Sequence, residues 1–293
     1  MLPETFTPSL LRQLELLKIR SRRAFLGSRQ GGHISLKRGH GIEFSDYRRY
    51  ELGDNPRHID WGVYARSDKL FIKTFQEEQD LSVLVLLDTS ASMFNPRSDR
   101  KWERARDLAI SLGYIALMEQ DSVSVAAPGL VQTPFYYGAR AIHELSRDLM
   151  GIENPPQADF LKEAQKAINR VRFPGVAVFI SDFLMPMEDA GAVLNLLRAK
   201  NLDITALQVL GPNDINPLES HTSLVAVDSE TGEEVDLALD SRQRQEYAAL
   251  LEEHNRKLQQ LLSSASIRYA RLESAAPLAD SLLKNLPATG LLR

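Results

Sequence analysis

Hydrophobic and polar positions alternate in a regular way from residue 81 to the end of the chain. Short apolar runs are separated by longer stretches whose apolar residues recur at helical spacing. The runs predict strands at 81–88, 121–127, 176–182, 203–210 and 267–272, with a short edge strand near 129–133. The longer stretches predict helices at 99–119, 139–150, 159–172, 188–200, 241–264 and 277–286. Such alternation is typical of right-handed βαβ units, and it predicts an α/β fold with a doubly wound, mostly parallel sheet.

Three further segments add to this plan. Leucines spaced through residues 8–25 predict an amphipathic helix. Residues 42–80 contain short strand-like pieces, of which 69–75 is the clearest, and they predict a small added β layer. Two apolar runs at 223–228 and 234–239 flank a turn-like segment and predict a hairpin. We therefore expect a first part at 1–80, made of the helix and the β segment, and a main domain at 81–293 with a hairpin insertion near 221–240.

The composition narrows the class of protein. The chain has no cysteine, so disulfides and thiolate metal sites are excluded, and this is compatible with a reducing compartment. No run approaches the ~20 apolar residues that span a bilayer, and the first residues do not form a signal peptide. We expect a cytoplasmic protein. Residues 1–40 hold eight Lys or Arg against two acids, although the net charge is −4.

The most informative segment is the end of the first predicted strand, where LSVLVLL runs into Asp88, Ser90 and Ser92. Ligands of open parallel sheets bind outside the carboxyl ends of the strands. One carboxylate and two hydroxyls are hard oxygen donors that suit Mg²⁺ or Mn²⁺. The D-x-S-x-S pattern resembles the metal-ion-dependent adhesion site of von Willebrand factor A domains.

A second apolar strand, VAVFIS, ends at Asp182. If the two strands are parallel neighbours, Asp88 and Asp182 meet at the same edge of the sheet. The alternative is that the short polar side chains after each strand only stabilise the turns in which they lie.

The block upstream of Asp88 is more distinctive still. It resembles the signature of the family known as domain of unknown function 58, an EF-x-x-x-R-x-Y-x-x-GD-x-x-R-x-IDW-x-x-x-AR pattern. The matching positions are Glu43, Phe44, Arg48, Tyr50, Gly53, Asp54, Arg57, Ile59, Asp60, Trp61, Ala65 and Arg66. The resemblance implies a bacterial protein with a von Willebrand factor A-like domain and a MoxR-type AAA+ ATPase as partner. It also implies action in the maturation or assembly of other proteins.

The chain departs from related adhesion sites at one position. Such sites usually take a threonine from a second loop, but Ala158 stands at the corresponding place. We therefore include Asp159 with Asp88, Ser90, Ser92 and Asp182 as candidate metal ligands.

Two readings of the block 43–66 stay open. It could be a docking surface, to which Arg48, Arg57, Trp61 and Arg66 contribute together with Thr89 of the adhesion-like loop. It could also be a salt-bridge network that attaches the small β layer to the main domain, a reading favoured by its alternating charges.

The leading functional hypothesis is a non-enzymatic adaptor that presents a metal-assisted face to a protein partner. One alternative is a metal-dependent hydrolase or phosphatase in which Asp88 attacks phosphorus. Haloacid dehalogenase-type enzymes use D-x-D, however, and Ser90 stands at the second Asp. Another alternative is nucleic-acid binding through the basic segment. We do not favour it, because Phe25 is the one aromatic residue among the basic residues there, and base stacking needs more.

Overall fold

The structure is a computed structural model that describes residues 2–22, 42–77, 81–156, 160–171, 175–217, 223–227, 234–238 and 241–293. Its internal contacts divide the chain into two units. The large unit consists of Met1–Arg22 with Leu81–Arg293, and the small unit is Arg23–Asp80. Residues 1–22 thus pack with the large unit, whereas the sequence analysis places them in one part with the residues up to 80.

A six-stranded sheet forms the centre of the large unit, and five of its strands are parallel. The order across the sheet is β10 (Arg268–Glu273), β7 (Asp203–Leu210), β6 (Gly175–Ser181), β3 (Ser82–Leu87), β4 (Ser122–Ala127) and β5 (Val131–Gln132). Only the short edge strand β5 runs antiparallel to its neighbour among these six. The predicted fold class, an α/β protein with a mostly parallel sheet, is confirmed.

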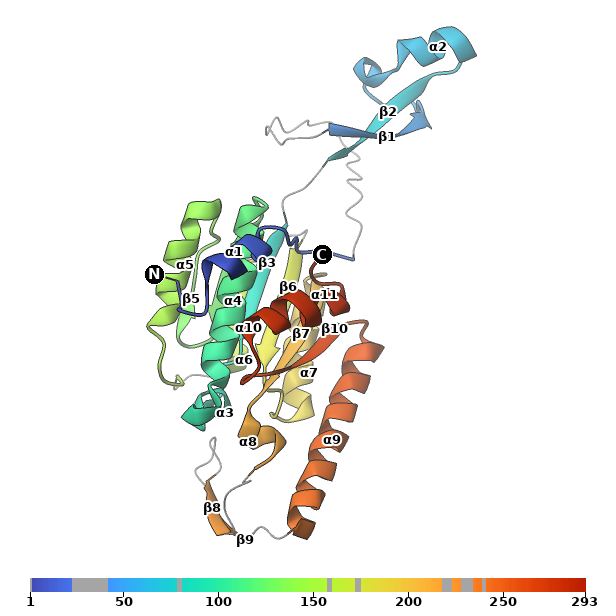
Figure 1. Ribbon diagram of the computed structural model, residues 1–293. Coiled ribbons are helices and arrows are strands. Elements are labelled where there is room, and N and C mark those ends of the chain that lie inside the picture. The colour runs from blue at the N-terminus through green and yellow to red at the C-terminus, as the bar shows by residue number, and fades with distance from the viewer. Residues whose placement is uncertain are drawn as a thin grey trace. The chain divides into compact units, whose positions relative to one another are not determined.

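Helices cover both faces of this sheet (Figure 1). The first face packs against α1 (Pro8–Leu14), α4 (Lys101–Met118), α5 (Ile142–Met150), α10 (Leu278–Asp280) and α11 (Leu286–Thr289). The second face packs against α6 (Phe160–Asn169), α7 (Met187–Ala199) and α9 (Ser241–Ser264). In β3, Val83 and Val85 belong to the first core and Leu84 and Leu86 to the second. Burial of alternate side chains on opposite faces explains why this strand is a continuous apolar run.

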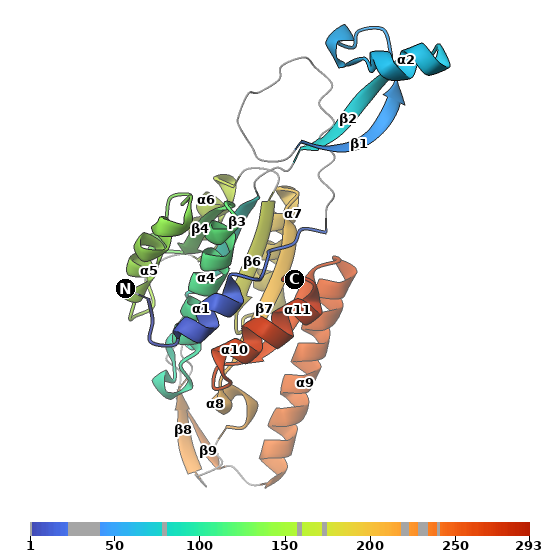
Figure 2. The same cartoon turned by 45° about the horizontal axis from the view of Figure 1, so that its top comes forward.

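The order of the strands creates a switch point between β3 and β6. The chain leaves β3 through α4 to β4 on one side, and β6 then pairs with β3 on the other side. The loops that leave β3 and β6 therefore diverge, and ligands of doubly wound sheets bind at such switch points. Two short helices, α3 (Ala91–Phe94) and α8 (Pro212–Ile215), lie at this end of the sheet (Figures 1 and 2).

The amino-terminal helix is shorter than the spacing of its leucines predicts. It ends at Leu14, and Ile19 forms a bridge with Leu292 near the other end of the chain. The backbone N–H of Lys18 donates to the carbonyl of Arg293 at 2.9 Å. Backbone pairing with the carboxyl-terminal segment replaces the helical bonds, so the prediction of a helix through 25 is wrong for residues 15–22. Residues 23–25 lie outside the described part.

The carboxyl-terminal part matches the predicted elements closely. Helix α9 and strand β7 have the predicted bounds. The predicted hairpin is present as β8 (Ser223–Val227) paired with β9 (Glu234–Ala238), while its turn lies outside the described residues. The last predicted helix is divided into α10, a π-helical turn at Ser281–Asn285 and α11.

The small unit is built on a two-stranded antiparallel ribbon. Strands β1 (Ile42–Arg49) and β2 (Phe71–Glu77) pair with a bulge between Phe44 and Asp46. They are joined by a 3₁₀ turn at Pro56–His58 and by helix α2 (Trp61–Ser67). The predicted strand at 69–75 thus begins two residues later. In neither unit does any described helix combine the length and the apolar character that crossing a bilayer requires.

Burial of an ion pair leads to a prediction about stability. Asp203 and Arg268 are both buried, and Arg268 Nη2 lies 2.6 Å from Asp203 Oδ2. Asp203→Asn leaves the guanidinium uncompensated, so we expect it to lower the free energy of unfolding by about 3–5 kcal/mol in urea titrations. The control is Glu252→Gln, which breaks an exposed pair with Arg271 and should cost about 0–1 kcal/mol. Equal costs for the two variants would show that burial does not set the strength of the Asp203 pair.

Candidate functional site

Asp88 is the first residue after β3, and it is fully buried. Its backbone N–H donates to the carbonyl of Ile180 at 2.8 Å, which extends the β3–β6 pairing by one residue. The side chain accepts hydrogen bonds from the backbone N–H of Ser90 to Oδ1 at 2.8 Å and from the hydroxyl of Ser181 to Oδ2 at 2.5 Å. Neighbouring strands therefore fix this carboxyl group in one orientation.

The surroundings of Asp88 make its negative charge costly. Burial, together with the nearby charge of Asp182, raises the pKa of the Asp88 carboxyl from 3.8 to about 6. Hydrogen bonds from Ser181 and Ser90 offset part of this shift. A carboxylate that is held where its charge is unfavourable is more typical of a binding or catalytic site than of a structural turn.

Ser90 and Ser92 supply two hydroxyls beside this carboxyl group. Their Oγ atoms lie 3.0 Å apart and share a hydrogen bond. Two adjacent ligands in an octahedral Mg²⁺ site, each about 2.1 Å from the metal, stand about 3.0 Å apart. The separation is that of an ordinary hydrogen bond, and it also matches the spacing of neighbouring ligands of one cation.

Thr89 does not face outward, contrary to the prediction that it contacts a partner. Its side chain is buried, and its hydroxyl donates to the carbonyl of Pro128 at 2.8 Å. Thr89 connects the loop after β3 to the end of β4. Successive side chains of this loop point in opposite directions. The hydroxyls of Ser90 and Ser92 therefore meet, while the side chain of Thr89 points into the protein.

Asp182 is the first residue after β6. It lies at the same edge of the sheet as Asp88 and is also fully buried. The expected convergence of the two carboxylates is present. The next residue, Phe183, has φ of +53°, a conformation that is strained for a bulky side chain. Its N–H donates to Ser181 Oγ at 2.8 Å, and its ring packs edge-on against Phe179 at 5.0 Å. These contacts hold the strained turn that presents Asp182.

Two residues that the sequence analysis did not select complete the cluster, Lys101 and Asp214. The ammonium of Lys101 lies 2.9 Å from Asp182 Oδ2 and 2.9 Å from Asp214 Oδ2. The Lys101 side chain is 1% exposed. One sequence signal was available: Lys101 is the first residue of α4, where a cation opposes the helix dipole, and this placement suggests a specific anionic partner elsewhere.

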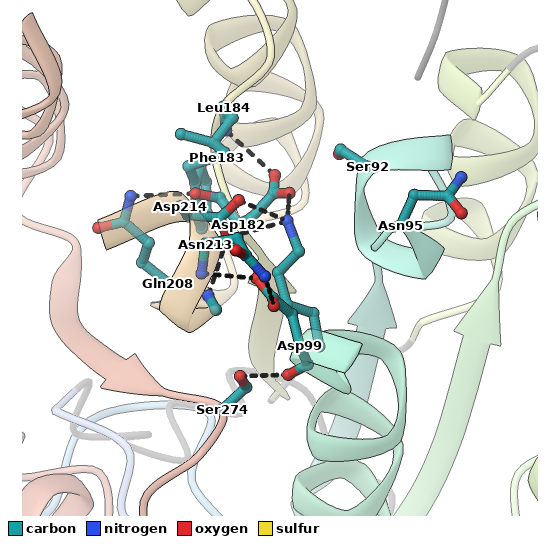
Figure 3. A network of polar contacts seen from close by, with 12 residues as sticks. Ser92, Asn95, Asp99, Asp182, Phe183, Leu184, Gln208, Asn213, Asp214 and Ser274 are labelled. Carbon is teal, nitrogen blue, oxygen red and sulfur yellow. Dashed lines mark hydrogen bonds and ion pairs between the residues drawn. The ribbon is translucent and has the colours of Figure 1, made fainter. Parts of the chain in front are cut away.

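Helix α8 is held against this cluster by a second set of contacts (Figure 3). The carboxylate of Asp99 accepts hydrogen bonds from the backbone N–H and from the side-chain amide of Asn213. A Cβ atom at Gly211 would collide with the side chain of Asp99, so only glycine fits there. Ser92 lies on the side of α3 that faces Asp182 in this view, whereas Asn95 lies on the other side.

The remaining predicted ligand, Asp159, lies outside the described residues together with Ala158. Within the part of the chain that the structure describes, no three His, Cys, Asp or Glu side chains are grouped as metal ligands usually are. A zinc-type site is therefore not favoured there. The donor set of two hydroxyls and two carboxylates fits a hard cation such as Mg²⁺, which keeps several waters of its own.

The predicted docking residues of the small unit are exposed. Trp61 is 60% exposed and meets Tyr64 edge-on, with ring centroids 6.0 Å apart. Arg48 forms a two-point ion pair with Asp54, at 2.7 and 2.6 Å. Arg57 and Arg66 also lie on the surface. The Arg48 pair is internal to the small unit, and the exposed indole gives this unit an apolar contact point.

Comparison with known proteins identifies a family and relatives. The profile described as "Protein of unknown function DUF58" matches residues 46–257. The chain is 27% identical over 255 residues to the uncharacterized proteins Mb1516 of Mycobacterium bovis and Rv1480 of Mycobacterium tuberculosis. These matches cover 84% of this chain and 79% of each relative.

Solved structures are similar only at a low level. The conserved hypothetical protein BatB from Bacteroides thetaiotaomicron aligns with 72% of this chain and 98% of its own, at 15% identity and a TM-score of 0.39. An aerotolerance-related membrane protein from Bacteroides fragilis aligns with 71% of this chain and 99% of its own, at 20% identity and a TM-score of 0.38.

The raised pKa of Asp88 predicts a pH dependence of stability. Because the folded state holds the Asp88 proton more tightly than the unfolded chain, this group favours folding below about pH 4. That contribution, roughly 3 kcal/mol, is lost as the pH rises from about 4 to 6. Asp88→Asn has no such proton to lose. In chelator, we expect its free energy of unfolding, relative to wild type, to increase between pH 4 and pH 7.

The control for this measurement is Asp189→Asn, which changes an exposed carboxylate on α7. Its difference from wild type should stay nearly constant with pH. A constant difference for Asp88→Asn as well would mean that burial does not penalise the Asp88 charge.

Proposed function

Because this chain belongs to the DUF58 family of proteins of unknown function, we propose a role on the basis of its site: it is a non-enzymatic adaptor that binds a protein partner through a metal-assisted face. The observation that carries this proposal is the meeting of Asp88, Ser90, Ser92 and Asp182 at the switch point between β3 and β6. The resemblance of D-x-S-x-S to adhesion-type sites supports Mg²⁺ or Mn²⁺ as the cation. The resemblance of residues 43–66 to the DUF58 signature supports a MoxR-type AAA+ ATPase as the partner.

The chemistry of the donor set supports a bridging role for the cation. Ser90 and Ser92 would hold the ion directly, and Asp88 and Asp182 would bind it either directly or through its waters. A hydrated Mg²⁺ can exchange one of these waters for a carboxylate from another protein. The partner would then contribute an Asp or Glu, and the cation would join the two chains.

Burial supports binding rather than nucleophilic catalysis. The carboxyl group of Asp88 is fully buried and both of its oxygens already accept hydrogen bonds, so it is poorly placed to attack a substrate. One histidine does lie near the site in space: His254 Nε2 is 2.6 Å from the carbonyl oxygen of Phe183. Its nitrogen is engaged by the backbone there. Mg²⁺-dependent turnover of a phosphomonoester that Asp88→Ala abolishes would replace the adaptor with an enzyme.

The small unit supports a second contact with the same partner. Trp61 and Tyr64 present aromatic surface, and the exposed Arg57 and Arg66 add positive charge to the same unit. Exposed Trp and Arg residues frequently dominate the energy of protein interfaces. We therefore propose α2 as a second contact with the partner, separate from the face at Asp88 and Asp182.

Metal binding is the first test of this proposal. We expect Mn²⁺ titrations, followed by calorimetry, to show one site whose affinity falls about 10- to 100-fold in Ser92→Ala, because a ligand hydroxyl is lost. Ser98→Ala removes a hydroxyl from the nearby Arg97–Asp99 turn and should leave the affinity unchanged. An equal loss in both variants, or none in either, would remove the serine pair from the proposed site.

Partner capture is the second test. Tagged protein incubated in lysate of the native host with Mg²⁺ should retain a MoxR-type AAA+ ATPase, identified by mass spectrometry. We expect chelator or Asp88→Ala to reduce recovery at least severalfold, and Trp61→Ala to reduce it while metal affinity stays the same. Asp189→Ala serves as a surface control.

The two halves of the proposal separate in this experiment. If neither chelator nor Asp88→Ala changes recovery of the ATPase, the ATPase remains the proposed partner but the metal bridge is rejected. Absence of the ATPase under all conditions would reject the partner.

A further inference from the structure

Lys101 occupies an unusual position for a lysine. It is the first residue of α4, and its side chain is almost completely buried. Its ammonium bonds to Asp182 Oδ2 at 2.9 Å and to Asp214 at 2.9 and 3.1 Å. Burial of an ammonium without anionic partners would be very costly, so the two carboxylates are what allow Lys101 to lie there as a charged group.

The contacts of Lys101 are those of a charged ammonium, because its nitrogen lies 2.9 Å from an oxygen of each of two carboxylates. Burial by itself lowers the pKa of Lys101, but Asp182 and Asp214 outweigh it and raise the pKa above its ordinary value. The ammonium thus lies against one oxygen of a carboxylate in the proposed metal site. The other oxygen of Asp182 accepts the backbone N–H of Leu184 at 3.1 Å.

The charges at this site are not balanced by Lys101 alone. Counted as formal charges, the carboxylates of Asp88, Asp182 and Asp214 exceed the single charge of Lys101 by two. One divalent cation would supply the missing charge. A cation near Asp88 and Asp182 would also repel the ammonium from the oxygen that it now holds.

Asp214 provides a second position for that ammonium. It belongs to α8, where its Oδ2 accepts the N–H of Gly211 at 2.8 Å and its backbone carbonyl accepts the hydroxyl of Tyr247 at 2.7 Å. Its side chain is 12% exposed, whereas that of Asp182 is fully buried. Lys101 can therefore keep an ion pair with Asp214 if Asp182 is taken by another cation.

We propose that Lys101 is a tethered cation that competes with the divalent metal for Asp182, and that Asp214 holds Lys101 when the metal is bound. The inference rests on the metal site of the proposed function. It adds that the affinity for the metal depends on whether the ammonium of Lys101 pairs with Asp182 or with Asp214. Lys101 is thus a positioning residue for the site.

The test compares Mn²⁺ affinities of three folded proteins by calorimetry and electron paramagnetic resonance. Lys101→Met/Asp214→Asn removes one positive and one negative charge, so the total charge is unchanged while Asp182 is freed. The asparagine keeps an acceptor for the N–H of Gly211. We expect this variant to bind Mn²⁺ about 10-fold more tightly than wild type, or better, a change of the size that neighbours of metal ligands produce.

Asp214→Asn alone should act in the opposite direction, because Lys101 is then confined to Asp182. We expect weaker Mn²⁺ binding than in wild type. The matched control is Lys166→Met/Glu163→Gln, which removes an exposed ion pair on α6 with the same change in charge and should not alter the affinity. If circular dichroism shows that Lys101→Met/Asp214→Asn does not fold, the Mn²⁺ affinity of the single Asp214→Asn variant tests the proposal.

The outcomes separate this inference from the function on which it rests. Wild-type binding of Mn²⁺ with no change in either Asp214 variant would overturn the role of Lys101 and leave the metal site in place. No binding in any of the proteins would overturn both. Binding that appears only after Lys101 is removed would support the competition and show that Lys101 dominates in the wild-type chain.

Discussion

The ammonium of Lys101, placed between Asp182 and Asp214, is the interaction on which the carboxyl edge of this sheet depends. Asp88 and Asp182 are fully buried there and Asp214 is largely buried, and buried carboxylates near one another repel strongly. A single buried cation relieves part of that repulsion. It also ties the end of β6 to α8 and the start of α4, so one ion pair network joins three separate segments of the chain.

The topology of the sheet explains why the acids meet at this place. Strands β3 and β6 are neighbours across the switch point, and the residues after them lie side by side. The turn that presents Asp182 includes Phe183 in a strained backbone conformation, and the charge of Asp88 is unfavourable where it is held. Both features lower stability. Proteins tend to keep such features where a site requires them, so they support a binding role for this edge.

The sequence was sufficient for the strands and for the acids that follow them. An apolar run such as residues 82–87 has few alternatives to a buried strand, and the residue that ends it must lie at the carboxyl edge. The amino-terminal helix was predicted too long because its leucines at helical spacing say nothing of Leu292, which pairs with Ile19 in space. Tertiary pairing of this kind overrides local propensity.

Lys101 and Asp214 were missed for a related reason. They are 113 residues apart in the chain, and no motif joins a lysine at the start of one helix to an aspartate in a short helix after β7. Thr89 was misassigned because a five-residue pattern does not say which hydroxyls point inward. The exposure of Trp61 could not be predicted either, since an indole in a block of alternating charges is equally compatible with a buried network.

The most direct test of this account is a crystal structure of the protein with and without Mn²⁺, in which the metal is located by anomalous scattering. The account predicts one peak about 2.1 Å from the hydroxyl oxygens of both Ser90 and Ser92. It also predicts that the Lys101 ammonium leaves Asp182 and stays with Asp214 in the metal-bound crystal. A peak at another location, or an unchanged Lys101–Asp182 contact beside a bound ion, would contradict it.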